Sequence, residues 1–307
     1  MFAMKDLSKE DIQEIISKTL NDIETKRPDA YILLLAGMHM ERNGWGKFIF
    51  NGSNSLAPAV LTLDDHIKTY LRSRNRIKSR LPLYDGLLLY AHIWETYWFQ
   101  LKLLRIANLI SGQNYPWFIP GTRTGSDFFE AGFFYENQVL KPLEHGAKPF
   151  ADLLRNVYRK DLRNHIAHGD FFVHSDSISF GYREYSTIKS GKGNKNNNDT
   201  LLPFTAWNNL LDRAICFYET LNKTIYQRQI SFIKAHPSGS IEIELPIEIN
   251  ATATLEWSSE KSLLGYFIPK SPFITRVGLY QTEEEKQAHQ QLIRDLTASL
   301  SETQPHK

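Results

Sequence analysis

The longest apolar-periodic stretch of the chain is residues 83–110, LYDGLLLYAHIWETYWFQLKLLRIANLI. Its large side chains recur at helical spacing, which predicts a long helix that is too polar for a membrane and long enough for a core. We interpret its large apolar residues as core or dimer surface rather than as a platform for stacking bases; they are Trp94, Tyr97, Trp98, Leu101 and Leu104. His92 and Glu95 are the polar exceptions. A buried carboxylate needs a partner, which an arginine on a neighbouring helix would supply.

Further helices are predicted downstream of this stretch. Residues 148–168 have a helical pattern, and Gly169 follows them at the position where a left-handed glycine commonly ends a helix. The next segment, FFVHSDSISFGYREYS, alternates loosely around a turn and predicts a hairpin. After a polar low-complexity loop at 189–199, residues 202–230 resume a helical pattern.

The two ends of the chain differ from this helical middle. Ser8 and Asp11 form a helix N-cap pattern near the start, and the Gly, Ser, Asn and Pro content of residues 43–63 predicts a loop with at most brief strands. Residues 241–257 alternate at period two and predict strands. The expected fold class is therefore mainly α, with three regions: a helical and loop extension at 1–82, a helical domain at 83–232, and a β-rich extension with a C-terminal helix at 233–307.

Composition excludes several classes of protein. Lys and Arg total 36 against 34 for Asp and Glu, so the net charge of +2 is that of neither a polyanionic tail nor a polycation. A hydrophobic fraction of 42% is enough for a packed core. The single cysteine, Cys216, excludes an intramolecular disulfide and a multi-cysteine zinc site. Because neither a membrane-length apolar run nor a secretory leader is present, we expect a soluble, cytoplasmic protein without a membrane partner.

A basic run precedes the long apolar stretch. It contains no acid after Asp65 and comprises Lys68, Arg72, Arg74, Arg76, Lys78 and Arg80. Such a run is either a solvated helix face or a patch that follows the phosphates of a nucleic acid, because clustered basic side chains release counterions. On the second interpretation Arg72, Arg74, Arg76 and Lys78 are candidate RNA-binding residues.

The residues that point to chemistry are at the end of the 148–168 helix, in YRKDLRNHIAHG. At the helical rotation per residue, Asn164 and His168 are about 40° apart and share a face, whereas Arg163 and His168 are about 140° apart. Only the long arginine stem would bring its guanidinium to a ligand beside His168. Lys160, one turn before Arg163, adds positive charge.

These residue types suit cleavage of a phosphodiester bond. Arginine presents a planar fork that matches phosphate oxygens, and histidine exchanges protons near neutral pH. A helix C-terminus favours the charged imidazole of His168. RNA supplies its own nucleophile in the 2′-OH, so no metal or cofactor is needed, but one base and one acid are. A single His168 cannot serve as both at one moment, whereas two copies across a two-fold axis can.

The segment resembles the HEPN superfamily (higher eukaryotes and prokaryotes nucleotide-binding), whose ribonuclease members carry an R-x-x-x-x-H motif, often with Asn after the arginine. Arg163, Asn164 and His168 match this motif, and the Ala-His-Gly ending is common in the family. The helical layout around the motif agrees, so the resemblance covers roughly residues 83–230. The chain departs from a minimal HEPN unit in its N-terminal 80 residues, its 186–200 insertion and its β-rich tail.

The resemblance implies a helical bundle that dimerises and joins two motifs in one cleft. It also implies a metal-independent endoribonuclease that leaves a 2′,3′-cyclic phosphate, as in toxin–antitoxin and anti-phage defence members. In this chain Arg163 would bind the scissile phosphate, His168 would be the acid or base, and Asn164 would orient it or the substrate. Glu95 is the candidate for the acidic residue that many members add from a preceding helix.

Other interpretations remain open. Arg163 could instead form a structural ion pair with Glu95 or Asp161, leaving His168 as a helix-capping residue. His165 and His168 could hold a metal, but no third ligand is suitably spaced. At the level of function, the alternative is a catalytically inactive HEPN-fold module that binds RNA or nucleotide, or pairs with a neutralising partner such as an antitoxin.

Overall fold

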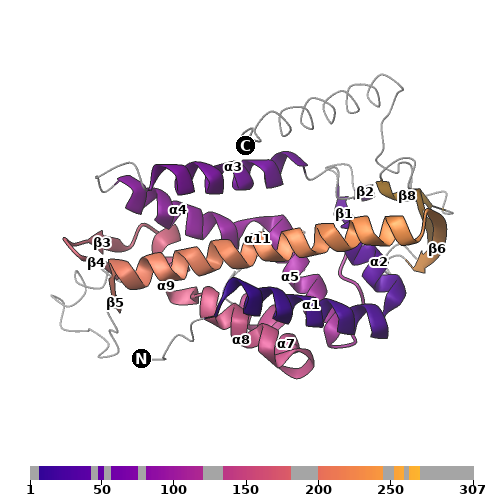
Figure 1. Ribbon diagram of the computed structural model, residues 1–307, viewed down its shortest axis with the longest axis horizontal. Coiled ribbons are helices and arrows are strands. Elements are labelled where there is room, and N and C mark those ends of the chain that lie inside the picture. The colour runs from indigo at the N-terminus through magenta and orange to yellow at the C-terminus, as the bar shows by residue number, and fades with distance from the viewer. Residues whose placement is uncertain are drawn as a thin grey trace, which may run out of the picture.

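Helix α11, Phe204–Ala235, runs nearly the length of the molecule, and most other helices pack around it (Figure 1). The computed structural model describes residues 7–42, 48–51, 57–74, 81–119, 134–180, 200–244, 252–258 and 263–269. The remaining helices are α1 Lys9–Lys26, α2 Pro28–Ala36, α3 Ala57–Ser73, α4 Leu81–Glu95, α5 Tyr97–Ile110, the π-helix η2 Phe134–Leu140, α7 Lys141–Gly146, α8 Lys148–Val157 and α9 Lys160–Ala167. The prediction of a mainly helical fold is confirmed.

Three small antiparallel sheets complete the described chain. The first pairs β1, His39–Arg42, with β2, Phe48–Asn51. The second has the order β3–β4–β5, Phe171–Val173, Ser177–Phe180 and Thr200–Pro203, and the third has the order β6–β7–β8, Ser238–Glu244, Thr252–Ser258 and Leu263–Pro269. The predicted hairpin after the motif helix is therefore confirmed as β3 and β4, and β5 leads from that sheet directly into α11. The predicted tail strands are β6 and β7. The predicted C-terminal helix lies outside the described residues.

The expected long helix over 83–110 is wrong, because the chain forms two helices that meet at Thr96. Thr96 adopts an extended conformation with φ −64° and ψ 113° and is the N-cap of α5. The break leaves the Trp94 carbonyl without a helical partner. Tyr135 Oη and Gln100 Nε2 each donate a hydrogen bond to it at 2.8 Å. Since both donors are buried, tertiary contacts stabilise a break that the apolar pattern does not show.

The single helix expected over 148–168 is also wrong, for a related reason. It breaks at Tyr158 and Arg159 into α8 and α9. The Tyr90 hydroxyl bridges this break, since it accepts a hydrogen bond from the Arg159 amide at 2.9 Å and donates one to the Val157 carbonyl at 3.0 Å. Tyr90 is fully buried. The motif residues are consequently on a short helix whose start is fixed from α4.

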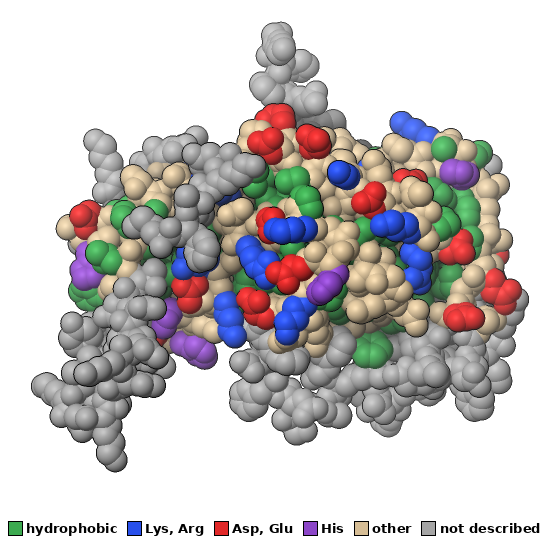
Figure 2. Space-filling view, turned by 90° about the horizontal axis from the view of Figure 1, so that it is seen from below, with side chains coloured by type: hydrophobic (Ala, Val, Ile, Leu, Met, Phe, Trp, Pro, Cys, Tyr) green, Lys and Arg blue, Asp and Glu red, His purple; other side chains and the backbone are tan. Residues whose placement is uncertain are grey.

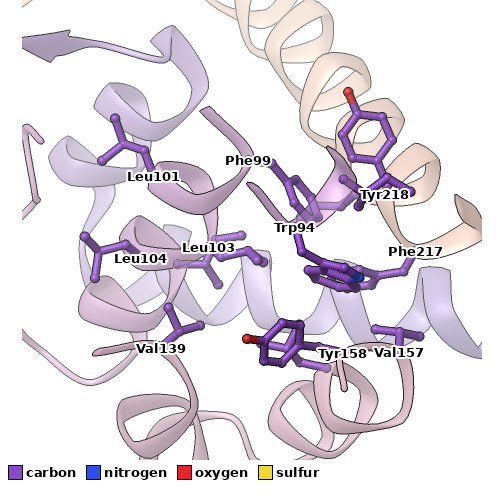
Figure 3. Packing of buried hydrophobic residues seen from close by; sticks show 14 of the residues in the cluster. Trp94, Phe99, Leu101, Leu103, Leu104, Val139, Val157, Tyr158, Phe217 and Tyr218 are labelled. Carbon is purple, nitrogen blue, oxygen red and sulfur yellow. The ribbon is translucent and has the colours of Figure 1, made fainter. Parts of the chain in front are cut away.

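The core is centred on Trp94, which is fully buried (Figure 3). Five aromatic rings lie with their centroids 5.2–6.3 Å from the Trp94 ring; they belong to Tyr90, Phe99, Tyr135, Tyr158 and Phe217. Leu101 and Leu104 are also buried, which confirms the core interpretation for these three predicted residues, whereas Tyr97 and Trp98 are only half-buried. The residue that precedes Glu95 is thus among the most firmly packed in the protein.

The N-terminal helices share this core. Ile16 of α1, Leu63 of α3 and Phe217 of α11 belong to one buried cluster, and Arg228 of α11 donates to Asn21 and the Ser17 carbonyl of α1. Helices α1 and α3 therefore extend the core of the helical domain. Helix α3 begins at Ala57, so the loop predicted over 43–63 is wrong for its last seven residues. Across the described ranges, no helix has the length and apolarity needed to cross a bilayer.

The surface seen from below the view of Figure 1 carries acidic and basic side chains close together (Figure 2). This mixture agrees with the near-balanced composition of the chain. The face shown there is therefore not a uniformly basic surface of the type that follows a nucleic-acid backbone.

Candidate functional site

Helix α9 is short and anchored by its buried residues; it carries Arg163 and Asn164, and His168 follows it as the C-cap. Leu162 and Ile166 are buried, so the remaining residues face outward or toward neighbouring helices. The helix ends in the predicted way: Gly169 has φ +64°, its amide donates to the Ile166 carbonyl, and the Asp170 amide donates to the His165 carbonyl. These two bonds form a Schellman motif, which fixes His168 as the C-cap.

Arg163 is held between two predicted site residues. Its Nη2 lies 2.8 Å from Glu95 Oε1, and its Nη1 donates to Asn164 Oδ1 at 3.0 Å. The Arg163 side chain is 15% exposed, and its Nε is buried without a hydrogen-bond partner. Arg163 pairs with Glu95 and not with Asp161, whose carboxylate accepts two hydrogen bonds from Arg159.

Glu95 reaches Arg163 because α4 ends there. It is the last residue of α4 and 41% exposed, whereas the preceding Trp94 is fully buried. The hydrogen bonds from Tyr135 and Gln100 to the Trp94 carbonyl fix this helix end. The position of the Glu95 carboxylate is therefore set by the aromatic core.

Tyr158 and Tyr135 lie on the buried side of Arg163. Burial raises the pKa of Tyr158 and of Tyr135, and the Arg163 guanidinium opposes both shifts. Their ring centroids are 4.1 Å apart, and the Tyr158 hydroxyl is buried without a hydrogen-bond partner. Arg163 thus has an aromatic, low-dielectric side and a carboxylate side, an environment that strengthens its attraction for a second anion.

The other motif residues are less enclosed. His168 is exposed, and its amide donates to the Asn164 carbonyl at 3.0 Å. Lys160 is exposed at the first position of α9. His165 pairs through Nδ1 with Asp170 at 3.1 Å. Arg163 therefore contacts both Glu95 and Asn164, and His168 lies about one turn beyond Asn164.

A second group of titratable residues lies on α4, one turn before Glu95. His92 is half-buried, and its ring centroid is 5.8 Å from that of His66 on α3. His66 Nε2 lies 2.9 Å from Asp85 Oδ1. Burial lowers the pKa of His92, the nearby His66 lowers it further, and Glu95 opposes the shift. The sequence marked His92 as polar, but the pairing of α3 with α4 that brings His66 to it was not predicted.

The basic run is only partly described. Lys68 and Arg72 are exposed on α3. Arg74 forms an ion pair with Asp212 of α11 and lies over the Tyr70 ring, so its charge is balanced within the protein. Arg76, Lys78 and Arg80 lie outside the described residues.

The described ranges, which include His165 and His168, contain no group of three or more His, Cys, Asp or Glu side chains arranged to hold a metal ion. Comparisons with models of known protein families, with curated proteins and with solved structures find no match to this chain.

Proposed function

We propose that this protein is a metal-independent endoribonuclease of the HEPN type, in which Arg163 binds the scissile phosphate and His168 transfers a proton. The proposal is supported chiefly by one observation: the Arg163 guanidinium is oriented by Glu95 and Asn164 at the end of a helix whose C-cap is an exposed histidine. Preorganised arginine beside a low-dielectric wall stabilises the charge that develops on a phosphorane.

The proposed reaction needs only RNA and protein side chains. The 2′-OH attacks the adjacent phosphorus, the 5′-oxygen leaves, and the products end in a 2′,3′-cyclic phosphate and a 5′-hydroxyl. Arg163 neutralises the non-bridging oxygens, and Asn164 keeps the guanidinium in place through its side-chain oxygen. We propose that the active form is a homodimer that joins two such helix ends. Leu88 and Tyr84 of α4 are 63% and 43% exposed and are candidates for that contact.

The proposed biological setting is a toxin or anti-phage defence effector that acts on cellular RNA and is restrained by an antitoxin or other neutralising partner. The test is cleavage of mixed RNA by the purified protein in EDTA, with Arg163→Ala and His168→Ala variants alongside. The matched control is His145→Ala, because His145 is an exposed histidine on α7 whose Nδ1 lies 2.7 Å from the Lys141 carbonyl oxygen of the same helix. We expect cleavage that the control retains and both site variants lose; equal cleavage by all four proteins would identify a contaminating nuclease.

A second function is favoured by the same ion pair. In the resting chain one arm of the Arg163 fork is occupied by Glu95, so a phosphate must compete with a carboxylate. This arrangement also suits a catalytically inactive HEPN-fold module that binds RNA or nucleotide. Saturable binding of RNA by wild-type protein without any cleavage, weakened in Arg163→Ala, would favour this alternative.

A further inference from the structure

The exposed side of α4 carries a titratable residue besides Glu95. Tyr84, Leu88 and Glu95 are exposed, and His92 is half-buried between them and α3. At the rotation of an α-helix, His92 and Glu95 are about 60° apart and separated by about 4.5 Å along the axis. His92 therefore lies on the same side of α4 as the carboxylate that binds Arg163.

The His92 ring packs against the ring of His66 from α3. Its ring is tilted by 43° against that of His66, and His66 is held by Asp85. Among the residues that the structure describes, neither His92 ring nitrogen has a hydrogen-bond partner. Among the described residues, the charged and titratable groups that act on it are His66 from α3, which is bound by Asp85, and Glu95 from α4, which is bound by Arg163 of α9.

Helical spacing brings the His92 imidazole close to the carboxylate that contacts Arg163. Residues one turn apart on a helix have their Cβ atoms about 5–6 Å apart. Glu95 contacts Arg163 directly. A phosphodiester that binds Arg163 next to Glu95, or in its place, thus brings the neighbouring ribose within reach of His92.

On the basis of the proposed function, we propose that His92 is a second catalytic residue of the same chain: it is the general base that removes the proton from the ribose 2′-OH, and His168 is the general acid. His92 Nδ1 or Nε2 accepts the proton as the 2′-oxygen–phosphorus bond forms. The bond from phosphorus to the 5′-oxygen breaks, and His168 donates a proton to that oxygen. No water, metal or oxidant is consumed.

The electrostatics of the site agree with this division of roles. Burial and the neighbouring His66 hold the pKa of His92 below its ordinary value of 6.5. An imidazole with a lowered pKa is neutral at neutral pH and can accept a proton. His66 is then a positioning residue, since it packs against the base and is itself fixed by Asp85.

The experiment compares two substrates of one RNA sequence, one with the normal 5′-oxygen leaving group and one with sulfur in its place. A thiolate leaves without a proton, so only the loss of a general acid is repaired by it. We expect His92→Gln to lower the cleavage rate by about 100-fold or more on both substrates. We expect His168→Gln to lose a similar factor on normal RNA and to recover most of it on the sulfur substrate, and the His145→Ala control to match wild type on both.

The pH dependence of kcat/KM is a second readout, and it would not change if the role of His92 were only structural. Since a general base must be deprotonated, kcat/KM of wild type should rise with pH through a limb below pH 6.5. His92→Gln should lack this limb. His66→Ala should move it to higher pH, because it removes a positive neighbour and admits water.

Three results would overturn the assignment. They are a His92→Gln rate within about threefold of wild type, a lost rate that the sulfur substrate restores, and a wild-type acidic limb that His92→Gln retains. If His92→Gln does not fold, a wild-type profile without a limb below pH 6.5 also overturns it. If His92→Gln is active while Arg163→Ala and His168→Ala are not, only the role assigned to His92 is wrong. If wild-type protein cleaves neither substrate, both that role and the proposed function are wrong.

Discussion

Replacing Arg163 by methionine tests whether this side chain is kept for stability or for binding a phosphate. Methionine retains the length of the stem against Tyr158 and Tyr135 but removes the charge and the buried Nε. The result depends on three contributions that the structure identifies. They are the unpartnered Nε, the ion pair with Glu95 and the hydrogen bond to Asn164.

The three contributions nearly cancel. A buried donor without a partner costs about 1–3 kcal/mol, whereas a hydrogen bond such as that to Asn164 contributes about 1 kcal/mol. An ion pair to a carboxylate that is 41% exposed is worth about 0.2–1 kcal/mol. We therefore expect Arg163→Met to leave the free energy of unfolding within about 1 kcal/mol of wild type. RNA cleavage or binding should nevertheless be lost.

Removing Glu95, the partner of Arg163 in the ion pair, should lower the free energy of unfolding more than Arg163→Met does. Glu95→Ala leaves a guanidinium that is only 15% exposed, with its Nε still unpaired and one neutral acceptor remaining. We expect a loss of about 1–3 kcal/mol. Urea unfolding of wild type and both variants, followed by circular dichroism, measures the two changes. The reasoning is refuted if Arg163→Met is the more destabilising variant.

Two further changes test elements that position the site, and a third tests the charge of Lys102 in α5. Tyr135→Phe should lower stability by about 1 kcal/mol in the same urea assay, because it removes one of two hydrogen bonds to the Trp94 carbonyl; an unchanged midpoint would mean that Tyr135 does not hold the break. Gly169→Ala should cost about 1 kcal/mol because its φ of +64° is left-handed, and a stabilised variant would argue against the Schellman ending. Burial lowers the pKa of Lys102 from 10.5 to about 8, so between these pH values the unfolded chain binds a proton that the folded chain does not. Lys102→Met should therefore be more stable than wild type at neutral pH, and the difference in the free energy of unfolding should shrink between pH 8 and 10.5. A difference that does not change with pH would contradict the lowered pKa.

The helical class and the ends of several elements could be predicted from local sequence. The Ser8 N-cap, the glycine at 169 and the hairpin after it depend on neighbouring residues, so the sequence alone is sufficient to place them. The two helix breaks could not be predicted, because their carbonyl and amide groups are bound by Tyr135 and Tyr90 from distant parts of the chain. Apolar periodicity continues through both breaks and therefore favours unbroken helices.

The candidate site shows the same limit. The spacing of Arg163, Asn164 and His168 is a local pattern, but the sequence leaves both Glu95 and Asp161 open as partners of the arginine. The choice of Glu95 depends on where α4 ends, which the aromatic core determines. The contact of His66 with His92 depends on the packing of α3 against α4, since the two residues are far apart in the sequence.

The most direct test of the central claim is the chemical identity of the ends made on a short RNA by wild-type protein in EDTA. Mass spectrometry of the products reads both ends of the cleaved bond. The account predicts a 2′,3′-cyclic phosphate and a 5′-hydroxyl, and no cleavage when the scissile ribose alone is replaced by 2′-deoxyribose. Products with a 3′-hydroxyl and a 5′-phosphate, or cleavage at the 2′-deoxy position, would contradict it.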